Sequence, residues 1–403
     1  MSDVLTNPLN LQSEPAAARW LFHLLSQLRC GSIEVRCPDG RTLDFPGARP
    51  GPHAMLALAD WGVCSDILSR GDIGLAEAYI AGRADSDDLI QLLLLGALNE
   101  QAIEQAVHGR WWATLAYRLR HLLRRNTRAG SRKNIHAHYD LGNDFYSLWL
   151  DPTMTYSAAL FEGEATRSLA AAQTAKYARI LRTLGARPGD HILEVGCGWG
   201  GFAEHAARAG CRVTGITISQ AQLEYAQQRI AAAGLQDRVE LRLQDYRDLD
   251  GRFDHVVSIE MFEAVGETYW PGYFAMLHDR LQPGGRAVVQ TITIAEAKFE
   301  RYRTGTDFIQ QYIFPGGMLP SPSRFREVAG AQGLAVAEMH FFGLDYAETL
   351  RRWHEQFNSV ARDVETRGFD ARFRRTWRFY LAYCEAGFRA RATDVMHALL
   401  VHA

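Results

Sequence analysis

A glycine-rich turn at residues 193–201 is the clearest chemical feature of the sequence, with glycine at positions 196, 198, 200 and 201. An apolar run typical of a strand precedes the turn, and a helical pattern follows it directly. Glycines at such a junction let the chain turn tightly and let a ligand approach the backbone at the carboxyl edge of an open α/β sheet. The turn therefore predicts a nucleotide-containing ligand, with simple packing and a pyrophosphate cofactor as the alternatives.

Residues beside this turn and after the next strands discriminate among such ligands. Glu194 lies two residues before the first glycine of the turn, as a candidate partner for the amino-acid part of a ligand. The second strand runs into residues 215–219 without the carboxylate that holds the ribose of a dinucleotide. The third runs into Asp245 and Tyr246, a polar and aromatic pair suited to an adenine ring. This layout favours S-adenosylmethionine over a dinucleotide.

Two glutamates, Glu260 and Glu263, form a second candidate group. Residues three apart share one helical face, so Glu260 would be an orienting partner of Glu263 if both lay in one turn. Metal ligands are not predicted, because His136 and His138 have no evident third ligand nearby.

Strand-like and helix-like segments alternate from about residue 186, which predicts a mostly parallel sheet covered by helices on both faces. The expected strands are 191–195, 212–217, 239–243, 253–259, 286–294 and 334–342, and the expected helices are 201–209, 219–233 and 269–281. Residues 345–402 are rich in arginine and are expected to be helical, covering one edge of the sheet.

The first part of the chain, residues 1–110, reads as a small α+β domain. A helical pattern at 16–29 precedes short extended segments at 33–35 and 42–45, and residues 85–88 form a helix start before a leucine-rich run.

A basic connector at residues 111–133 follows this domain. Residues 110–133 include no acidic residue and eight arginines or lysines, interleaved with leucines and with Trp111 and Trp112. An amphipathic helix of this kind suits an anionic membrane surface. A solvated linker or a partner-binding face is the alternative.

Composition excludes other classes of protein. The 403 residues include 44 Lys+Arg and 46 Asp+Glu, so the net charge of −2 favours no nucleic acid. The longest apolar stretch, 89–98, is too short to span a membrane, and the first residues lack a secretion signal. Six scattered cysteines do not suggest a disulfide framework. We therefore expect a cytoplasmic protein.

A series of motifs in one order resembles the cyclopropane-fatty-acyl-phospholipid synthases, which include the mycolic acid cyclopropane synthases. The motifs are residues 134–146, 151–157, 193–201, 259–266, 283–285, 312–317, 343–346 and 383–388. The resemblance implies an α/β, class I (Rossmann-like) methyltransferase domain over 134–403 with a C-terminal helical cap. It also implies methylene transfer from S-adenosylmethionine to a cis double bond of an unsaturated phospholipid, giving a cyclopropane fatty acid.

The resemblance also assigns residues. The implied cofactor contacts are Tyr156, Ser157, Gly196, Gly198, Thr217, Ile218, Gln222, Asp245 and Tyr246, beside the candidate Glu194. A bicarbonate ion, the base of the family's reaction, would be held by Glu263, Gln290, Ile292, Tyr346 and the backbone of Ala158.

Two of these positions depart from the family pattern. Ala158 stands where cysteine is usual, and Gln290 stands where histidine is usual. An amide can donate and accept hydrogen bonds but cannot titrate. Gln290 therefore motivates a methylene- or methyl-branched product as the alternative to the ring. Methylation of a soluble metabolite and non-catalytic lipid binding are more distant alternatives.

The resemblance further implies the partners and the location. We expect an unsaturated phospholipid substrate at the inner membrane surface, peripheral association from the cytoplasm and a homodimer. A reductase would be a further partner if the product is methylene-branched.

Overall fold

The computed structural model describes residues 14–100, 141–164 and 166–403. The basic connector 111–133 and residues 134–140, with His136 and His138, lie outside the described residues. The chain divides into two compact units, Met1–Thr114 and Leu115–Ala403. Each unit is described by itself below.

The first unit is a small α+β fold, as expected. Its helices and strands are α1 (Ala16–Leu25), β1 (Ser32–Arg36), β2 (Thr42–Pro46), β3 (His53–Leu58), α2 (Gly62–Ile80), β4 (Ala84–Asp85) and α3 (Leu89–Leu98). The sheet has the order β2-β1-β3-β4, with β1 antiparallel to β2 and parallel to β3. Asp88 caps α3, because its carboxylate accepts hydrogen bonds from the N–H groups of Ile90 and Gln91, both at 3.0 Å.

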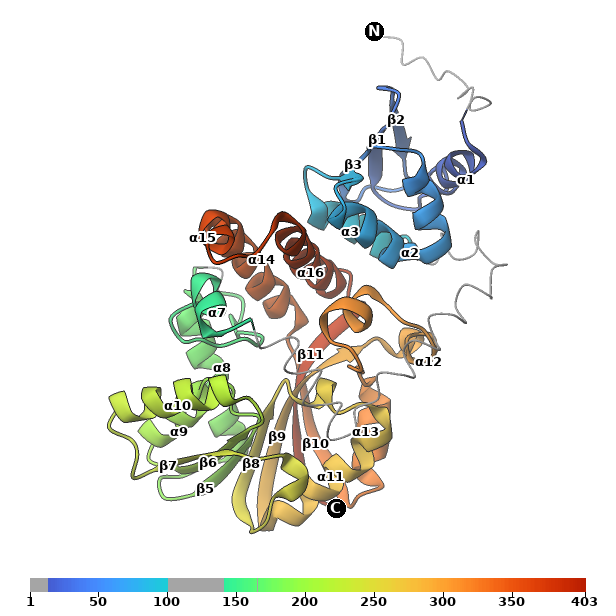
Figure 1. Cartoon of the computed structure of the whole chain (residues 1–403). Coiled ribbons are helices and arrows are strands. Elements are labelled where there is room, and N and C mark those ends of the chain that lie inside the picture. Colours follow the sequence, from blue (N-terminus) through green and yellow to red (C-terminus); the bar gives the residue numbers. More distant parts are fainter. Residues whose placement is uncertain (1–13, 101–140, 165) are drawn as a thin grey trace. The chain divides into compact units, whose positions relative to one another are not determined.

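A seven-stranded sheet with the order β10-β11-β9-β8-β5-β6-β7 forms the centre of the second unit (Figure 1). The strands are β5 (His191–Val195), β6 (Arg212–Thr217), β7 (Val239–Leu243), β8 (Phe253–Ile259), β9 (Leu281–Ile294), β10 (Leu334–Phe341) and β11 (Thr393–His402). Strands β5 to β9 pair in parallel, whereas β11 is antiparallel to both β9 and β10. The expected parallel strands are confirmed, four of them to the residue.

Helices cover both faces of this sheet. The helices of this unit are α7 (Asn143–Trp149), α8 (Leu169–Leu184), α9 (Gly201–Arg208), α10 (Gln220–Ala232), α11 (Trp270–Arg280), α12 (Glu296–Thr304), α13 (Pro322–Gly330), α14 (Gly343–Ser359), α15 (Ala361–Thr366) and α16 (Ala371–Arg389), of which α8 and α9 lie against one face and α11 and α13 against the other. Successive strand residues point to opposite faces. Val257 and Val288 accordingly pack in one core cluster with α8 and α9, while Val256 and Val289 pack in another with α11 and α13.

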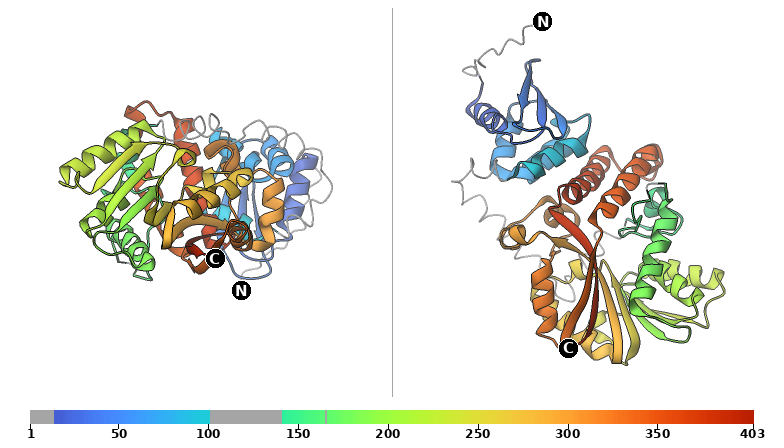
Figure 2. Two further views of the ribbon diagram at one scale, coloured as in Figure 1. Left: turned by 90° about the horizontal axis from the view of Figure 1, so that it is seen from below. Right: turned by 180° about the vertical axis from the view of Figure 1, so that it is seen from behind.

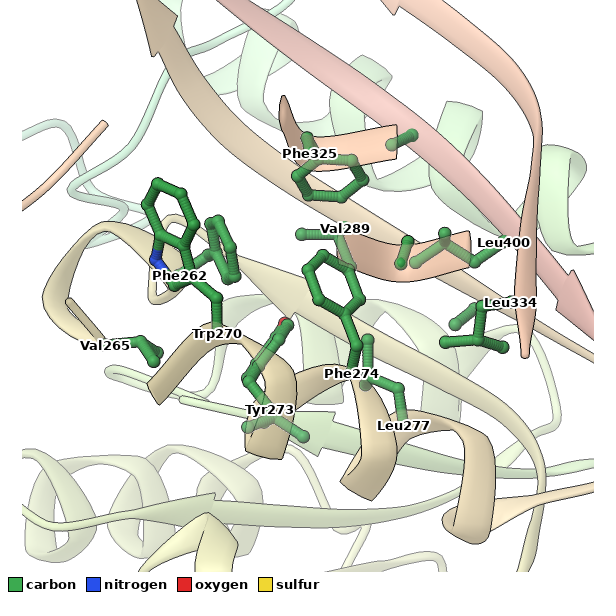
Figure 3. Close-up of a cluster of buried hydrophobic side chains, with 14 of the residues drawn as sticks. Phe262, Val265, Trp270, Tyr273, Phe274, Leu277, Val289, Phe325, Leu334 and Leu400 are labelled. Carbon is green, nitrogen blue, oxygen red and sulfur yellow. The ribbon is translucent and has the colours of Figure 1, made fainter. Parts of the chain in front are cut away.

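An aromatic cluster on the α11 face fixes the segment that follows β8 (Figure 3). The ring of Phe262 stacks on Trp270 at 5.3 Å between centroids and lies 5.4 Å from Phe274, which in turn lies 5.0 Å from Phe325. All four side chains are fully buried. Because Phe262 is the neighbour of Glu263, this cluster holds the backbone of a candidate catalytic residue.

The C-terminal part is only partly as expected. Helices α14, α15 and α16 lie together beyond the edge of the sheet where the parallel strands end (Figures 1 and 2), which confirms the helical cap. The expectation of helix for the whole of 345–402 was wrong for Thr393–His402, which form β11. This segment buries Val395, Met396, Ala398 and Leu400 between β9 and β10, so its pairing partners decide its conformation.

Within the described ranges, the helices are too short or too polar to cross a bilayer.

Candidate active site

A cavity of about 340 Å³ opens where β5, β6, β7 and β8 end. Strand β5 lies between β6 and β8, so the chain order reverses there, which is where open α/β sheets bind ligands. The structure brings every expected cofactor residue to this cavity: Tyr156, Ser157, Glu194, Gly196, Gly198, Thr217, Ile218, Gln222, Asp245 and Tyr246.

The glycine turn presents bare backbone to the cavity. Gly196 and Gly198 have φ of 84° and 51°, in the left-handed region that favours glycine. A Cβ atom at position 198 would meet nothing within 4 Å among the described residues. The turn therefore leaves room for a ligand to lie against the main chain.

Glu194 lines the same cavity, although its side chain is almost fully buried. Burial raises the pKa of its carboxyl group well above the usual range, against a hydrogen bond from the N–H of Ala203 and the charges of Arg229 and Lys176. In the described part of the chain its Oε2 atom has no hydrogen-bond partner. A buried carboxylate with a free oxygen suits a cationic group of a ligand.

Other expected cofactor residues are held by neighbouring side chains. Thr217 donates through Oγ1 to Oε1 of Gln222 at 3.0 Å. The carboxylate of Asp245 accepts two hydrogen bonds from the guanidinium of Arg247, at 2.9 and 2.7 Å. These contacts fix side-chain orientation before a ligand binds.

Lys176 on α8 was missed by the sequence analysis. Its side chain is fully buried, and its Nζ atom donates to Oγ of Ser157 at 2.6 Å. Burial lowers the lysine pKa to about 7, against the charges of Glu260, Asp151 and Glu194. The sequence offered one signal that this lysine is buried. It lies four residues after Ala172 and four residues before Ile180, on a helix face that is otherwise largely apolar.

Glu260 follows β8 with a φ of 49°, in the left-handed region. Its Oε1 atom accepts hydrogen bonds from the N–H of Ala158 at 2.8 Å and from Nε2 of Gln290 at 2.7 Å. Its Oε2 atom accepts from the hydroxyl of Tyr346 at 2.7 Å. Three segments distant in sequence thus converge on one carboxylate that lines the cavity.

Glu263 lies in the short helix η3 (Phe262–Ala264). Its Oε1 atom accepts from the N–H of Ile292 at 2.6 Å and from Oγ1 of Thr291 at 2.9 Å. Its Oε2 atom has no hydrogen-bond partner among the residues described. Burial, and then the charge of Glu260, raise the pKa of Glu263 to about 8.

The surroundings of the two glutamates favour the ionised form of Glu260 more strongly than that of Glu263. Burial also raises the pKa of Glu260, but Tyr346, Ala158, Lys176 and Gln290 all favour its ionised form. We infer that the pair holds one proton, on the free oxygen of Glu263, while Glu260 is ionised.

The expected catalytic residues are only partly placed as predicted. Glu263, Ile292 and Tyr346 line the cavity. Gln290 and Ala158 do not line it, but both donate hydrogen bonds to Glu260, which does. The shared helical face expected for Glu260 and Glu263 is not formed, because Glu260 precedes η3 and is not helical.

The rest of the cavity wall is mainly apolar and aromatic. It comes from the segment after β9 and from α14 and α16, through Ile309, Phe314, Pro315, Met318, Leu319, Leu350, Tyr380 and Phe388. Such a wall suits a hydrocarbon chain. Phe314, Pro315 and Phe388 belong to motifs that carry the family resemblance, whereas the other five residues had no predicted role.

Residues 126–398 match the family model described as mycolic acid cyclopropane synthetase. The chain belongs to this family. It is 41% identical over 350 residues to the tuberculostearic acid methyltransferase UfaA1 of Mycobacterium tuberculosis, covering 83% of this chain and 81% of that protein. It is 34% identical over 326 residues to the cyclopropane-fatty-acyl-phospholipid synthase of Escherichia coli K12, covering 81% and 82%.

Solved structures of the mycolic acid cyclopropane synthetase family agree. The synthase CmaA1, complexed with S-adenosylhomocysteine (SAH) and CTAB, is 33% identical with a TM-score of 0.63, covering 67% of this chain and 97% of that one. The second unit thus has the class I methyltransferase fold. The chain is an S-adenosylmethionine-dependent methyltransferase. The open glycine turn and the free oxygen of Glu194 fit this donor.

Bicarbonate does not fit the site. Of the five residues expected to hold it, Glu263 is an acceptor, and the donors are the N–H groups of Ala158 and Ile292 and the side chains of Gln290 and Tyr346. All four donate to Glu260 or Glu263 instead. The carboxylate of Glu260 thus occupies the position expected for the ion.

Replacing Glu194 by glutamine should weaken binding of S-adenosylmethionine about 10- to 100-fold, because a charge-assisted hydrogen bond is lost. Calorimetry would measure this loss, with the exposed Asp237→Asn as a control. Since burial keeps the Glu194 pKa high, binding to the wild type should also release a proton, seen in buffers of different ionisation enthalpy. An unchanged affinity would contradict this role.

Replacing Glu263 by glutamine should stabilise the protein at alkaline pH. The Glu263 pKa is about 8 in the folded chain and about 4.5 when unfolded, so its contribution to stability is lost as pH rises toward 8. We expect the Tm of Glu263→Gln to exceed that of the wild type by at least about 3 °C at pH 8.5, and by less at pH 5. The exposed Glu224→Gln should show no such trend.

Proposed function

We propose that this protein transfers the methyl group of S-adenosylmethionine to a cis double bond in the acyl chain of an unsaturated phospholipid, giving a methylene-branched chain. The observation that carries the proposal is the carboxylate of Glu260, held by three donors in a cavity that also includes the glycine turn and the apolar wall. This carboxylate is the base that the reaction needs.

Holding the reactants together is the first task of the site. An alkene is a weak nucleophile, and S-adenosylmethionine supplies a methyl group on a good leaving group. The backbone at Gly196 and Gly198 and the carboxylate of Glu194 would hold this donor. Proximity and alignment are the main contributions that a protein makes to such a step.

Protecting a cation is the second task. Methylation of one alkene carbon leaves a positive charge on its neighbour, and water would trap it. The mainly apolar wall disfavours water, and the rings of Phe314, Tyr346 and Tyr380 in this wall can stabilise positive charge without removing a proton.

Removing a proton is the third task. A hydride moves from the methylated carbon to its neighbour and leaves the charge on the more substituted carbon. The new methyl group then loses a proton to Glu260, and its C–H electron pair forms the double bond of a methylene (=CH₂) branch. The chain gains one carbon and two hydrogens.

A cyclopropane ring is the second candidate product, formed if the methyl group loses its proton before the hydride moves. The presence of Glu263, Ile292 and Tyr346 and the similarity to the Escherichia coli synthase support the ring. Glu260 and Gln290 support the branched product. So does the similarity to UfaA1 and, at 41% identity over 259 residues, to a probable fatty acid methyltransferase of Pseudomonas putida.

Incubation with dioleoyl phospholipid vesicles and labelled S-adenosylmethionine tests the proposal. Both products have the same mass. Ozonolysis cleaves the methylene branch of the first product to a ketone, whereas it leaves the cyclopropane ring of the second product intact. We expect the ketone. An ozone-resistant product would establish the ring, and an absence of labelled lipid would refute both.

The setting of the reaction is also part of the proposal. The basic connector 111–133 would place the enzyme on the anionic inner membrane surface from the cytoplasm, and a reductase would saturate the methylene product. Sedimentation with anionic vesicles, compared between the wild type and Arg124→Glu/Arg125→Glu, tests the membrane contact. The homodimer stays a prediction.

A further inference from the structure

His397 on β11 lies directly opposite Gln290 on β9. Both side chains are almost fully buried. The Nε2 atom of His397 is 2.8 Å from Oε1 of Gln290, and Nε2 of Gln290 donates to Oε1 of Glu260 at 2.7 Å. The imidazole is thus connected to the proposed base through one amide.

The direction of both hydrogen bonds in this series follows from the charge of Glu260. An ionised Glu260 only accepts hydrogen bonds, so the amide NH₂ of Gln290 must face it. The carbonyl oxygen of Gln290 then faces His397 and needs a donor. His397 must therefore carry its proton on Nε2.

The surroundings keep His397 neutral, and the described residues offer its ring no hydrogen-bond partner besides Gln290. Its Nδ1 atom has no hydrogen-bond partner within the described residues, and its ring packs edge-on against Phe342 at 4.7 Å. Burial, and then the charges of Arg179, Lys176 and His340, keep its pKa well below the usual range.

We propose that His397 is a positioning residue that locks the amide of Gln290, so that its NH₂ group points at Glu260 and holds this carboxylate in its ionised form. The inference rests on the proposed function, since it concerns the base of that reaction. Without the imidazole donor, the amide can turn over and bring its oxygen against the carboxylate, which disfavours the charged base.

Turnover of phospholipid vesicles as a function of pH tests this role. In His397→Leu the acidic midpoint should move up by about one unit, so turnover below it falls about tenfold, with an unchanged KM for S-adenosylmethionine. His397→Gln keeps a donor and should restore the wild-type profile. His340→Leu removes a neighbouring histidine that has its ring 6.5 Å from His397, and should leave the midpoint unchanged.

Other ionisable groups face the same centre and are unchanged in the two His397 variants. They are Lys176 and Arg179 from α8, Glu263 from η3, His340 from β10 and Tyr346 from α14. Calorimetric binding of SAH to each variant checks that the cofactor site is intact.

An unshifted midpoint in His397→Leu would overturn the proposal, as would an equal shift in His397→Gln or His340→Leu. If His397→Leu does not fold, the wild type still decides, because ¹⁵N NMR of labelled histidine reports the tautomer. We expect the Nε2–H form, and an Nδ1–H or doubly protonated ring would contradict the proposal. This measurement needs no lipid product, so it also separates failure of the proposed function from failure of this inference.

Discussion

Glu260→Gln should lower turnover of an unsaturated phospholipid by about 10³-fold while leaving the affinity for S-adenosylmethionine within a few-fold of the wild type. A positioned general base contributes about 10²- to 10⁴-fold, and an amide cannot accept the proton. The side chain keeps its size, so the cavity should keep its shape. Radiolabelled lipid formation and calorimetry measure the two quantities.

Glu263→Gln is the matched control for this experiment. Its pKa of about 8 means that Glu263 is already protonated at neutral pH, so a neutral amide changes little. We expect a loss of no more than about tenfold, well below the loss for Glu260. Equal losses in the two variants would show that the roles of the glutamates are not divided as proposed.

Glu260→Gly should be as inactive as Glu260→Gln, yet regain at least about tenfold in turnover when bicarbonate or formate is added. Removing the side chain frees the donors of Ala158, Gln290 and Tyr346, which a small oxyanion can then occupy. Glycine also accepts the φ of 49° at this position more easily than glutamate does.

The same anions should have no effect on the wild type or on Glu260→Gln, because a side chain fills the position in both. Stimulation of the wild type by bicarbonate would show that Glu260 moves aside for the ion. A Glu260→Gly variant that responds to neither anion would refute its role as base.

The local pattern was sufficient to predict the parallel strands of the second unit. Strands β5, β6, β7 and β8 have the expected bounds, because buried parallel strands are short apolar runs between turns. The segment Thr393–His402 was not recognised. Its strand conformation depends on pairing with β9 and β10, which are more than fifty residues away in sequence.

The candidate site was predicted to a similar degree. The glycine turn and the motif resemblance identified the residues lining the donor side of the cavity. They did not predict that Glu260 would take the position of the expected bicarbonate. That arrangement depends on the left-handed backbone at Glu260 and on donors from residues 158, 290 and 346, which only the tertiary structure brings together.

The position of β11 has a consequence for how the enzyme matures. This strand inserts between β9 and β10, and it delivers the imidazole next to Gln290. Until residues 393–402 have left the ribosome, β9 and β10 have no common neighbour, and the amide beside Glu260 has no fixed orientation. The orientation of the amide beside Glu260 therefore depends on a strand that follows every other strand of the sheet in the chain.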